Sequence, residues 1–509
     1  MLQVILNNRF FVLYFGPFFL GLLTVFSFQP FNFSFINFFI LPLLFLLIVY
    51  VKSKSKNVYR KKPYLKNLFL IGLTFGFGFY LSGIFWIAHS LTFDENFKFL
   101  IPFAIIFIPL FLSCFVGLTT LIVGQYLRYD ISSILLFSGS FSFSDYIRSK
   151  ILTGFPWNLW SYSWSWFTEI LQILNIFGLF AFNLLTITIF TIPAILFFEK
   201  KMNKKIILLS CTTLLIFFAY IYGTIAINKN NYLLNNLNKN DLTHIKVISP
   251  NFELKYNLSI NEMEKKITKL IKYSEPNKTE STIFIWPEGV FSGFDFNQIS
   301  KFNYLIKNSF GDNHFIVFGV NTIDKNSGQY FNSLVVVDNN FKIVEKYNKQ
   351  KLVPFGEFLP FQNFLSYFGL KKITQGHESF IRGEKQKNII IKNLNILPLI
   401  CYEIIFPELS QSANSETNVI VNISEDAWFG DTIGPHQHFS KAIFRAIENN
   451  SFLLRSANQG ISAIINNKGE IIKKLNANEV GNIEMSIPLL KSNYKNKNDL
   501  IFFILLFTY

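Results

Sequence analysis

The chain has 509 residues, of which 50% are hydrophobic and only 16% charged, and its mean hydropathy is positive. This composition excludes an ordinary soluble protein, and the length allows about two to four domains. The net charge is +15, but the polar part of the chain has no basic run interleaved with aromatic residues, so no nucleic-acid partner is expected. The three cysteines offer neither a disulfide framework nor paired metal-ligand spacing, and we expect no cofactor and no metal.

Apolar residues are concentrated in positions 1–228, which we predict to form a helical membrane domain. A helix needs about 20 apolar residues to cross a bilayer. About seven stretches reach or approach this length, and the fifth is short and rich in serine. They are 10–28, 31–51, 68–91, 99–127, 131–146, 170–198 and 206–227.

Lysine and arginine gather in alternate loops of this membrane part. The loop after the second stretch carries Lys52, Lys54, Lys56, Arg60, Lys61, Lys62 and Lys66, and Lys200, Lys201, Lys204 and Lys205 follow the sixth. Because cytoplasmic loops are enriched in these residues, the N-terminus is expected in the cytoplasm. An odd number of spans then places residue 229 onward on the opposite side of the membrane.

The segment 154–166 is rich in tryptophan. It contains Trp157, Trp160, Trp164 and Trp166. Aromatic side chains favour the headgroup level of a bilayer. The segment therefore forms either an interfacial belt or a lipid-facing rim beneath the polar domain.

Residues 229–498 have the composition of a globular domain and alternate between strand and helix patterns. Short β-branched or aromatic runs predict strands, and apolar residues at helical spacing predict helices. Mixed strands and helices of this kind predict an α/β layered domain. The predicted strands include 244–248, 282–286, 315–320, 396–400 and 419–422, and the predicted helices are 259–273 and 437–449.

The chain ends in a short apolar membrane segment, 499–509. It is too short to cross a bilayer by itself. It is either a stunted eighth span or a tail that only dips into the bilayer.

Three chemically distinctive residues, Glu288, Lys349 and Cys401, each lie where a strand-like run ends. In layered α/β folds such ends converge on one rim of the sheet. A lysine ammonium stabilises a thiolate, and a carboxylate can take the thiol proton. Lys349 and a main-chain N–H just after the nucleophile could then stabilise the oxyanion. The pattern predicts covalent acyl chemistry with Cys401 as the nucleophile.

Several strings around these residues carry a family resemblance. The segment from about 242 to 490 resembles the carbon–nitrogen hydrolase (nitrilase) superfamily, whose sites use Glu, Lys and Cys. With the preceding spans, the whole chain resembles the bacterial apolipoprotein N-acyltransferase family. The supporting strings are Trp286-Pro287-Glu288, Tyr347-Asn348-Lys349, 352–357 (LVPFGE), Cys401-Tyr402-Glu403, 426–430 (DAWFG), 434–438 (GPHQH) and 445–449 (RAIEN).

The resemblance implies a four-layer α-β-β-α sandwich on a membrane bundle in the bacterial inner membrane, with the catalytic domain on the periplasmic side. It implies an acyl chain taken from a membrane phospholipid onto Cys401 and passed to the α-amino group of a diacylglyceryl-cysteine apolipoprotein, in ping-pong order. By the same resemblance Glu288 is the base, Lys349 stabilises the intermediates and Glu357 supports them. Tyr402 and Glu403 then line the site.

The sequence also departs from the family pattern. The family usually has Asn before the DAWFG string, where this chain has Glu425. It often carries a Trp on a mobile arm, for which the candidate here is Tyr256. Neither departure touches the three catalytic candidates.

Two other functions would account for parts of this sequence. A membrane-anchored carbon–nitrogen hydrolase, an amidase or nitrilase, would share the same three residues, but a soluble amide substrate needs at most one anchor. A transporter would place charged residues inside its spans, and these stretches are almost free of them. The repeated spans therefore favour a lipid acyl donor.

Overall fold

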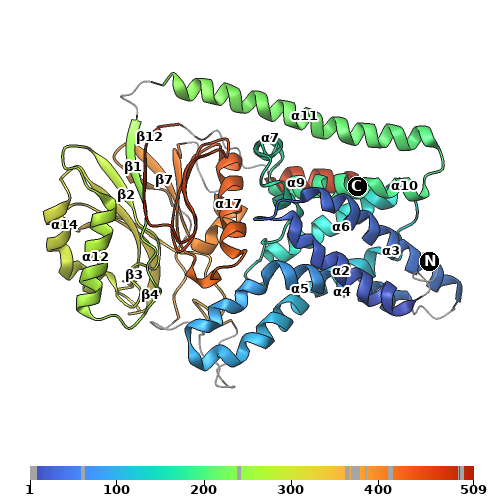
Figure 1. The fold of residues 1–509 in the computed structure, drawn as a ribbon, viewed down its shortest axis with the longest axis horizontal. Coiled ribbons are helices and arrows are strands. Elements are labelled where there is room, and N and C mark those ends of the chain that lie inside the picture. Colours follow the sequence, from blue (N-terminus) through green and yellow to red (C-terminus); the bar gives the residue numbers. More distant parts are fainter. Residues whose placement is uncertain are drawn as a thin grey trace. The chain divides into compact units, whose positions relative to one another are not determined.

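The computed structural model describes residues 8–58, 64–237, 242–360, 367, 379–384, 387–410, 416–490, 492 and 498–509. These residues form two units. The first, here the helical unit, comprises Met1–His89, Phe99–Ala226 and Lys497–Tyr509. The second, here the α/β unit, comprises Ser90–Lys98 and Ile227–Asn496 (Figure 1). The loop Ser90–Lys98 thus joins the α/β unit although it lies between two predicted spans.

The helical unit consists of helices joined by short turns. Apolar residues dominate each helix, and Asp130 caps the start of α6 by accepting from Ser133 N at 2.8 Å. The helices are α2 (Gly16–Leu23), α3 (Asn37–Val58), α4 (Tyr64–Ile84), α5 (Ile101–Val123), α6 (Ile131–Lys150), α7 (Thr168–Leu171), α8 (Leu174–Phe177), α9 (Leu179–Thr191), α10 (Ile195–Phe198), α11 (Met202–Asn235) and α18 (Asn498–Thr508).

Within the described ranges, five helical stretches are long and apolar enough to cross a membrane. They are Ser34–Lys54, Tyr64–Phe93, Glu95–Val123, Leu179–Phe198 and Met202–Asn235. The chain is therefore a multi-pass membrane protein, as predicted. The two remaining predicted stretches are also helical, as Phe11–Ser27 and as α6. The count of seven spans stays a prediction, and Arg60, Lys61 and Lys62 of the predicted basic loop lie outside the described residues.

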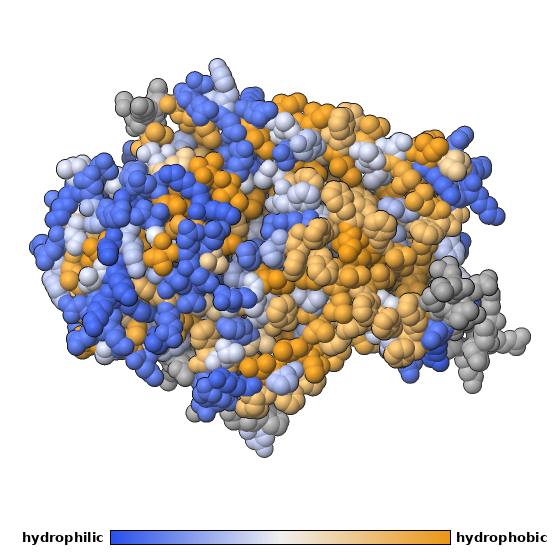
Figure 2. Space-filling model, viewed as in Figure 1, coloured by the Kyte–Doolittle hydropathy of each residue, from blue (hydrophilic) through white to orange (hydrophobic). Residues whose placement is uncertain are grey.

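The surface of the helical unit is apolar where its outer helices are exposed. Phe107 in α5 and Phe217 in α11 expose 58% and 54% of their surface. Figure 2 shows apolar residues over the visible face of this unit and hydrophilic residues over the α/β unit. Exposed large apolar side chains of this density suit contact with lipid rather than water.

The tryptophan-rich segment is packed inside the helical unit. Trp157, Trp160 and Trp164 are 1%, 3% and 3% exposed, and only Trp166 reaches 38%. Trp160 stacks on Phe79 at 5.2 Å. The prediction of a belt or lipid-facing rim is therefore wrong for the first three tryptophans. Their aromatic surface is buried among neighbouring helices instead.

The C-terminal segment is the helix α18 of the helical unit. Tyr509 lies with its hydroxyl 3.0 Å from that of Thr188 in α9, and Tyr146 of α6 donates to Asp499 at 3.3 Å. Phe502 is fully buried. The segment is thus anchored by its own packing, and whether it enters the bilayer stays a prediction.

The α/β unit contains two six-stranded sheets. Strand order is β12-β1-β2-β3-β4-β5 in one and β11-β10-β9-β8-β7-β6 in the other. The central strands of each sheet run parallel to one another: β1, β2 and β3 in the first sheet, and β7, β8 and β9 in the second. The strands are β1 (Leu242–Ser249), β2 (Thr282–Ile285), β3 (Phe315–Ile323), β4 (Tyr330–Val337), β5 (Ile343–Asn348), β6 (Ile389–Ile391), β7 (Leu394–Ile400), β8 (Val419–Glu425), β9 (Phe452–Asn458), β10 (Ser462–Ile465), β11 (Ile471–Leu475) and β12 (Gly481–Pro488).

The sheets pack face to face with helices outside, which confirms the predicted α-β-β-α sandwich (Figure 1). Inward residues such as Val247, Ile285 and Ile400 form the core between the sheets. Helices α12 (Ile260–Ser274) and α14 (Asn303–Ser309) cover the first sheet, and α17 (Gly434–Asn449) covers the second. Shorter helical elements, including α13 (Phe296–Ile299) and α16 (Pro407–Ser410), lie in the loops.

Candidate active site

Cys401 lies at the sharp turn between β7 and the short helix Cys401–Ile405. Its φ of +50° is left-handed, a conformation that costs a residue with a Cβ about 1 kcal/mol or more. The turn lifts the side chain off the end of the strand. The residue is 8% exposed, and burial raises the pKa of the Cys401 thiol above its usual value. The resting thiol is therefore protonated, and a base must remove its proton.

Glu288 lies just beyond β2, because Pro287 ends the strand. A Cβ on Gly319 of β3 would lie 2.8 Å from the Glu288 Cα, so the glycine admits this close approach. Glu288 Oε2 accepts from the Glu425 main-chain N at 3.1 Å. The main chain of Glu288 packs closely on Gly319, and its carboxylate is held by the Glu425 N–H. The carboxylate is therefore fixed at the rim of the sheets.

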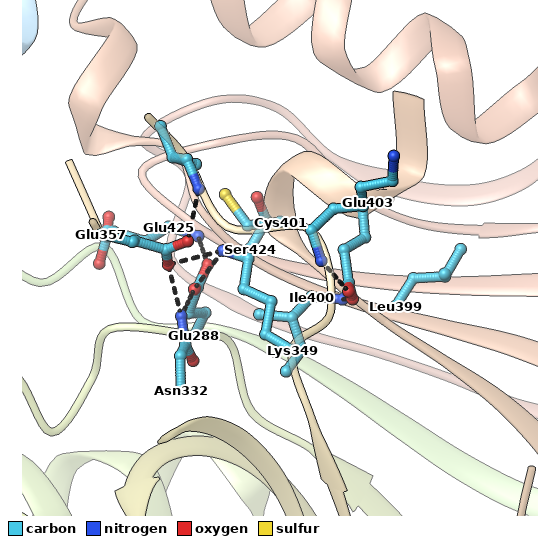
Figure 3. Close-up of polar contacts among 12 residues, drawn as sticks. Glu288, Asn332, Lys349, Glu357, Leu399, Ile400, Cys401, Glu403, Ser424 and Glu425 are labelled. Carbon is cyan, nitrogen blue, oxygen red and sulfur yellow. Dashed lines mark hydrogen bonds and ion pairs between the residues drawn. The ribbon is translucent and has the colours of Figure 1, made fainter. Parts of the chain in front are cut away.

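Lys349 follows β5 and joins Glu288 to Glu357 (Figure 3). Its Nζ donates to Glu357 Oε1 at 2.8 Å and to Glu288 Oε1 at 3.5 Å. Asn332 Nδ2 from β4 donates to the same two oxygens, both at 2.8 Å. Two carboxylates therefore share one ammonium and one amide.

The charge of this cluster favours an ammonium on Lys349. Its side chain is 1% exposed, and burial alone would lower its pKa. The carboxylates of Glu288 and Glu357 outweigh burial and hold the pKa of Lys349 above its usual value. The two carboxylates therefore favour the ammonium form of Lys349, which donates hydrogen bonds to them.

Glu403 braces the main chain that carries the site. Its Oε1 accepts from Tyr347 Oη at 2.9 Å, from Gln350 N at 2.7 Å and from Lys351 N at 3.1 Å. Its Oε2 accepts from Ile400 N at 2.8 Å. Figure 3 shows Glu403 on the far side of Cys401 from the Glu288–Glu357 pair. It ties the chain after Lys349 to the chain before Cys401.

Replacing this brace should loosen the two loops that carry Lys349 and Cys401. Glu403→Gln keeps the shape of the side chain but replaces one carboxylate oxygen by an NH2 group. This NH2 group would face another donor, either the Ile400 N–H or the three donors that contact Oε1, and would leave it without an acceptor. We expect unfolding to become easier by about 1–3 kcal/mol, the range for an unsatisfied buried group. Thermal unfolding of the detergent-solubilised chain measures this, and unchanged stability would show that Glu403 is not a brace.

The two tyrosines named from the sequence occupy different places. Tyr402 is half-buried and packs edge-on against Phe406 with ring centroids 5.0 Å apart. Tyr256 lies in the segment after β1, 6.3 Å from the Trp428 ring. Burial, and then the carboxyl groups of Glu425 and Glu288, raise the pKa of Tyr256 well above its usual range. Tyr256 thus lies within electrostatic reach of these two carboxyl groups.

A second buried network supports the Cys401 turn from behind. His438 Nε2 of α17 donates to the Cys401 carbonyl oxygen at 3.3 Å, and Nδ1 lies 3.0 Å from Asp426 Oδ1. Arg455 Nη2 donates to Asp426 Oδ2 at 2.8 Å. Burial alone would raise the pKa of Asp426, but Arg455 and His438 hold it below its usual value. The network therefore holds the Cys401 carbonyl from the side of α17.

Known proteins match most of this chain in sequence. Residues 20–192 match the model "Apolipoprotein N-acyltransferase N-terminal domain" and residues 263–491 match "Carbon-nitrogen hydrolase". The apolipoprotein N-acyltransferase of Rickettsia prowazekii is 32% identical over 92% of this chain and 90% of its own length. That of Rickettsia typhi is 33% identical over 92% and 91%. The chain belongs to the apolipoprotein N-acyltransferase family. The apolipoprotein N-acyltransferase of Rhizobium leguminosarum is 30% identical over 82% of this chain and 80% of its own length.

Two solved structures are similar to about half of this N-acyltransferase family member. An amidase from Nesterenkonia sp. is 15% identical, with a TM-score of 0.36, over 50% of this chain and 94% of its own. Saccharomyces cerevisiae Nit3, of the nitrilase superfamily, is 16% identical with the same TM-score, over 49% of this chain and 90% of its own.

In this N-acyltransferase family member the structure gathers most of the residues named from the sequence. Glu288, Lys349 and Glu357 share direct contacts, and Cys401 lies beside them (Figure 3). Sequence reasoning missed Asn332, which touches both carboxylates. Its one signal is a polar side chain inside a β-branched strand.

Proposed function

We propose that the chain transfers a fatty acyl group from a membrane phospholipid, through a thioester on Cys401, to the α-amino group of a lipoprotein's diacylglyceryl-cysteine. The convergence of Glu288, Lys349 and Glu357 beside a buried thiol carries this proposal, together with family membership. Apolipoprotein N-acyltransferase is also the name of the relatives described above.

In the first half-reaction the Glu288 carboxylate takes the Cys401 thiol proton while sulfur attacks the ester carbonyl carbon. Negative charge grows on the carbonyl oxygen, where an N–H of Lys349 stabilises it. The ester C–O bond then breaks, and the proton passes from Glu288 to the leaving lysophospholipid oxygen. The products are a thioester on Cys401 and a lysophospholipid.

The second half-reaction uses the same groups. The α-amine of the acceptor attacks the thioester carbonyl and gives a proton to Glu288. The C–S bond breaks, an amide forms, and Glu288 returns the proton to sulfur. Because water would give a free fatty acid instead, the proposal requires that the amine reach the thioester before water does.

One experiment tests this sequence. Purified full-length chain is incubated with phospholipid vesicles, and the mass of the Cys401 peptide is measured before and after a synthetic diacylglyceryl-cysteine peptide is added. We expect an acyl adduct on Cys401 that moves to the peptide amine. Release of free fatty acid without acylated peptide would instead favour the hydrolase alternative, and no adduct would reject the thioester.

The proposal also places the α/β unit outside the cytoplasm, in the periplasm of a bacterial cell with the helical unit in the inner membrane. The distribution of lysine and arginine supports this. Reporter fusions after residue 58 or 202 should report the cytoplasm, and a fusion near residue 275 should report the outside. A cytoplasmic signal near 275 would put the site on the wrong side for this substrate.

A further inference from the structure

Glu425, the residue that departs from the family pattern, lies against the candidate base. It ends β8 and is 2% exposed. Its main-chain N–H holds Glu288 Oε2 at 3.1 Å. Its side chain folds back on the same turn, where Oε1 accepts from Ala427 N at 3.1 Å. The folded-back side chain therefore shapes the turn that points the N–H at Glu288.

The far side of the Glu425 carboxyl joins the segment that carries Tyr256. Asn458 Nδ2 donates to Glu425 Oε1 at 3.1 Å and to Oε2 at 2.9 Å. The same Asn458 clamps Phe252, accepting from its N at 2.7 Å and donating to its O at 2.9 Å. Phe252 begins the segment 252–258, the Tyr256 arm, between β1 and α12. One carboxyl thus connects the turn that holds Glu288 with the anchor of the Tyr256 arm.

Glu425 makes no direct ion pair that would balance a negative charge, although Lys266 of α12 lies within electrostatic reach. Across the described ranges it forms no ion pair with Lys, Arg or His, and its donors are amides. The Lys349 ammonium is already shared by Glu288 and Glu357, and Asp426 takes the Arg455 guanidinium. A third carboxylate at this rim would be buried beside two others.

The surrounding titratable groups favour the neutral form of Glu425. Burial raises the pKa of Glu425 well above its usual range, and the amides of Asn458 and Ala427 oppose the rise only in part. The charged and titratable groups that face it are Glu288, Asp426, Tyr256 and, from α12, Lys266. The first two add to the rise, and Lys266 is turned to Glu253 O at 3.4 Å.

We propose that Glu425 is a positioning residue that works as an uncharged carboxylic acid, holding the Glu288 carboxylate and the anchor of the Tyr256 arm in place for acylation of Cys401. The inference rests on the proposed roles of Cys401 and Glu288. Ionisation of Glu425 would set a second carboxylate against Glu288 and pull the Asn458 amide toward the new charge. Acylation should then slow as Glu425 loses its proton.

The test compares the pH dependence of acyl-enzyme formation in Glu425→Gln and wild type, with phospholipid vesicles as donor. Gln stays neutral but places an NH2 group where the acid has an oxygen, which changes the rate by a factor that does not depend on pH. The ratio of variant to wild-type rates should still rise by about tenfold per pH unit once Glu425 ionises. Glu425→Ala should be slower at every pH, because Ala427 N and Asn458 lose their acceptor. Glu253→Gln is the matched control, since it removes an exposed carboxylate from the same arm and should leave the profile unchanged.

Unfolding provides a readout independent of activity. The folded-state pKa of Glu425 lies above the unfolded value of about 4.3, so its stabilising contribution is present below that value and is lost as pH rises. The stability difference between Glu425→Gln and wild type should therefore shift in favour of the variant as pH rises above about 4.3, by up to tenfold in the unfolding constant per pH unit.

The outcomes separate this inference from the proposed function. No acyl-enzyme in wild type would reject the function itself. Wild-type acylation with a Gln-to-wild-type rate ratio and a stability difference that are both flat with pH would reject only the neutral role of Glu425. A Gln-to-wild-type rate ratio that falls as pH rises would also reject it, since the charged form of Glu425 would then be the active one.

Discussion

Cys401→Ser is expected to lower acyl-enzyme formation by at least about 10³-fold, the scale on which removal of a nucleophile acts. A serine hydroxyl gives up its proton far less readily than a thiol, and its anion has to form in the same buried place. Burial, and then the charge of Glu288, already raise the pKa of the Cys401 thiol, against the pull of Lys349. The same burial and the same negative charge would raise the pKa of a serine hydroxyl, which is already higher than that of a thiol.

The fold should tolerate this exchange. Both side chains have a Cβ, so the left-handed turn at φ +50° is equally strained in each. The measurement is the mass of the peptide containing residue 401 after incubation with phospholipid, with thermal unfolding as the check on folding. A serine variant that acylates at near the wild-type rate would remove Cys401 from the mechanism.

The other two thiols supply the matched control. Cys114 and Cys211 lie in α5 and α11 of the helical unit, the first half-buried and the second exposed. Cys114→Ser with Cys211→Ser should leave the acyl adduct intact, because neither belongs to the α/β unit that carries the carboxylates. Loss of the adduct in this double variant would mean that the acyl group had been attached to Cys114 or Cys211 rather than to Cys401.

Much of the site could be predicted because strand ends are visible in the sequence. Pro287 ends β2, and the apolar run before Cys401 ends at the residue itself. Parallel strands bring such ends to one rim, so three residues far apart in the chain were expected together. Asn332 could not be found this way, since it lies inside β4 and reaches the carboxylates only because β4 pairs with both β3 and β5.

The direction in which a side chain points was the other feature that could not be predicted from the sequence. Cys401-Tyr402-Glu403 are consecutive, and the resemblance placed all three at the site. The tight turn sends the Glu403 carboxylate back to Ile400 N and Gln350 N instead. In the helical unit the tryptophans of 154–166 were assigned to the headgroup level by residue type. The structure buries Trp157 and Trp160, because composition does not say which neighbours surround a side chain.

Glu288→Gln should reduce acylation of Cys401 by roughly 10²–10⁴-fold, the usual contribution of a general base. The amide cannot take the thiol proton, and no other described carboxylate is placed to replace it: Glu357 is tied to Val353 N at 2.8 Å and to Lys349. The rate of acyl-enzyme formation from phospholipid measures this, at a pH where wild type is active.

Glu357→Gln is the matched comparison for this base. Each substitution removes one of the two carboxylates bonded to Lys349, so each changes the charge of the cluster equally. A purely electrostatic role would therefore slow both variants alike. Proton transfer predicts a larger loss for Glu288→Gln, with Glu357→Gln reduced by roughly tenfold through a lost charged hydrogen bond. Equal losses, or a greater loss at Glu357, would move the base from Glu288 to its neighbour.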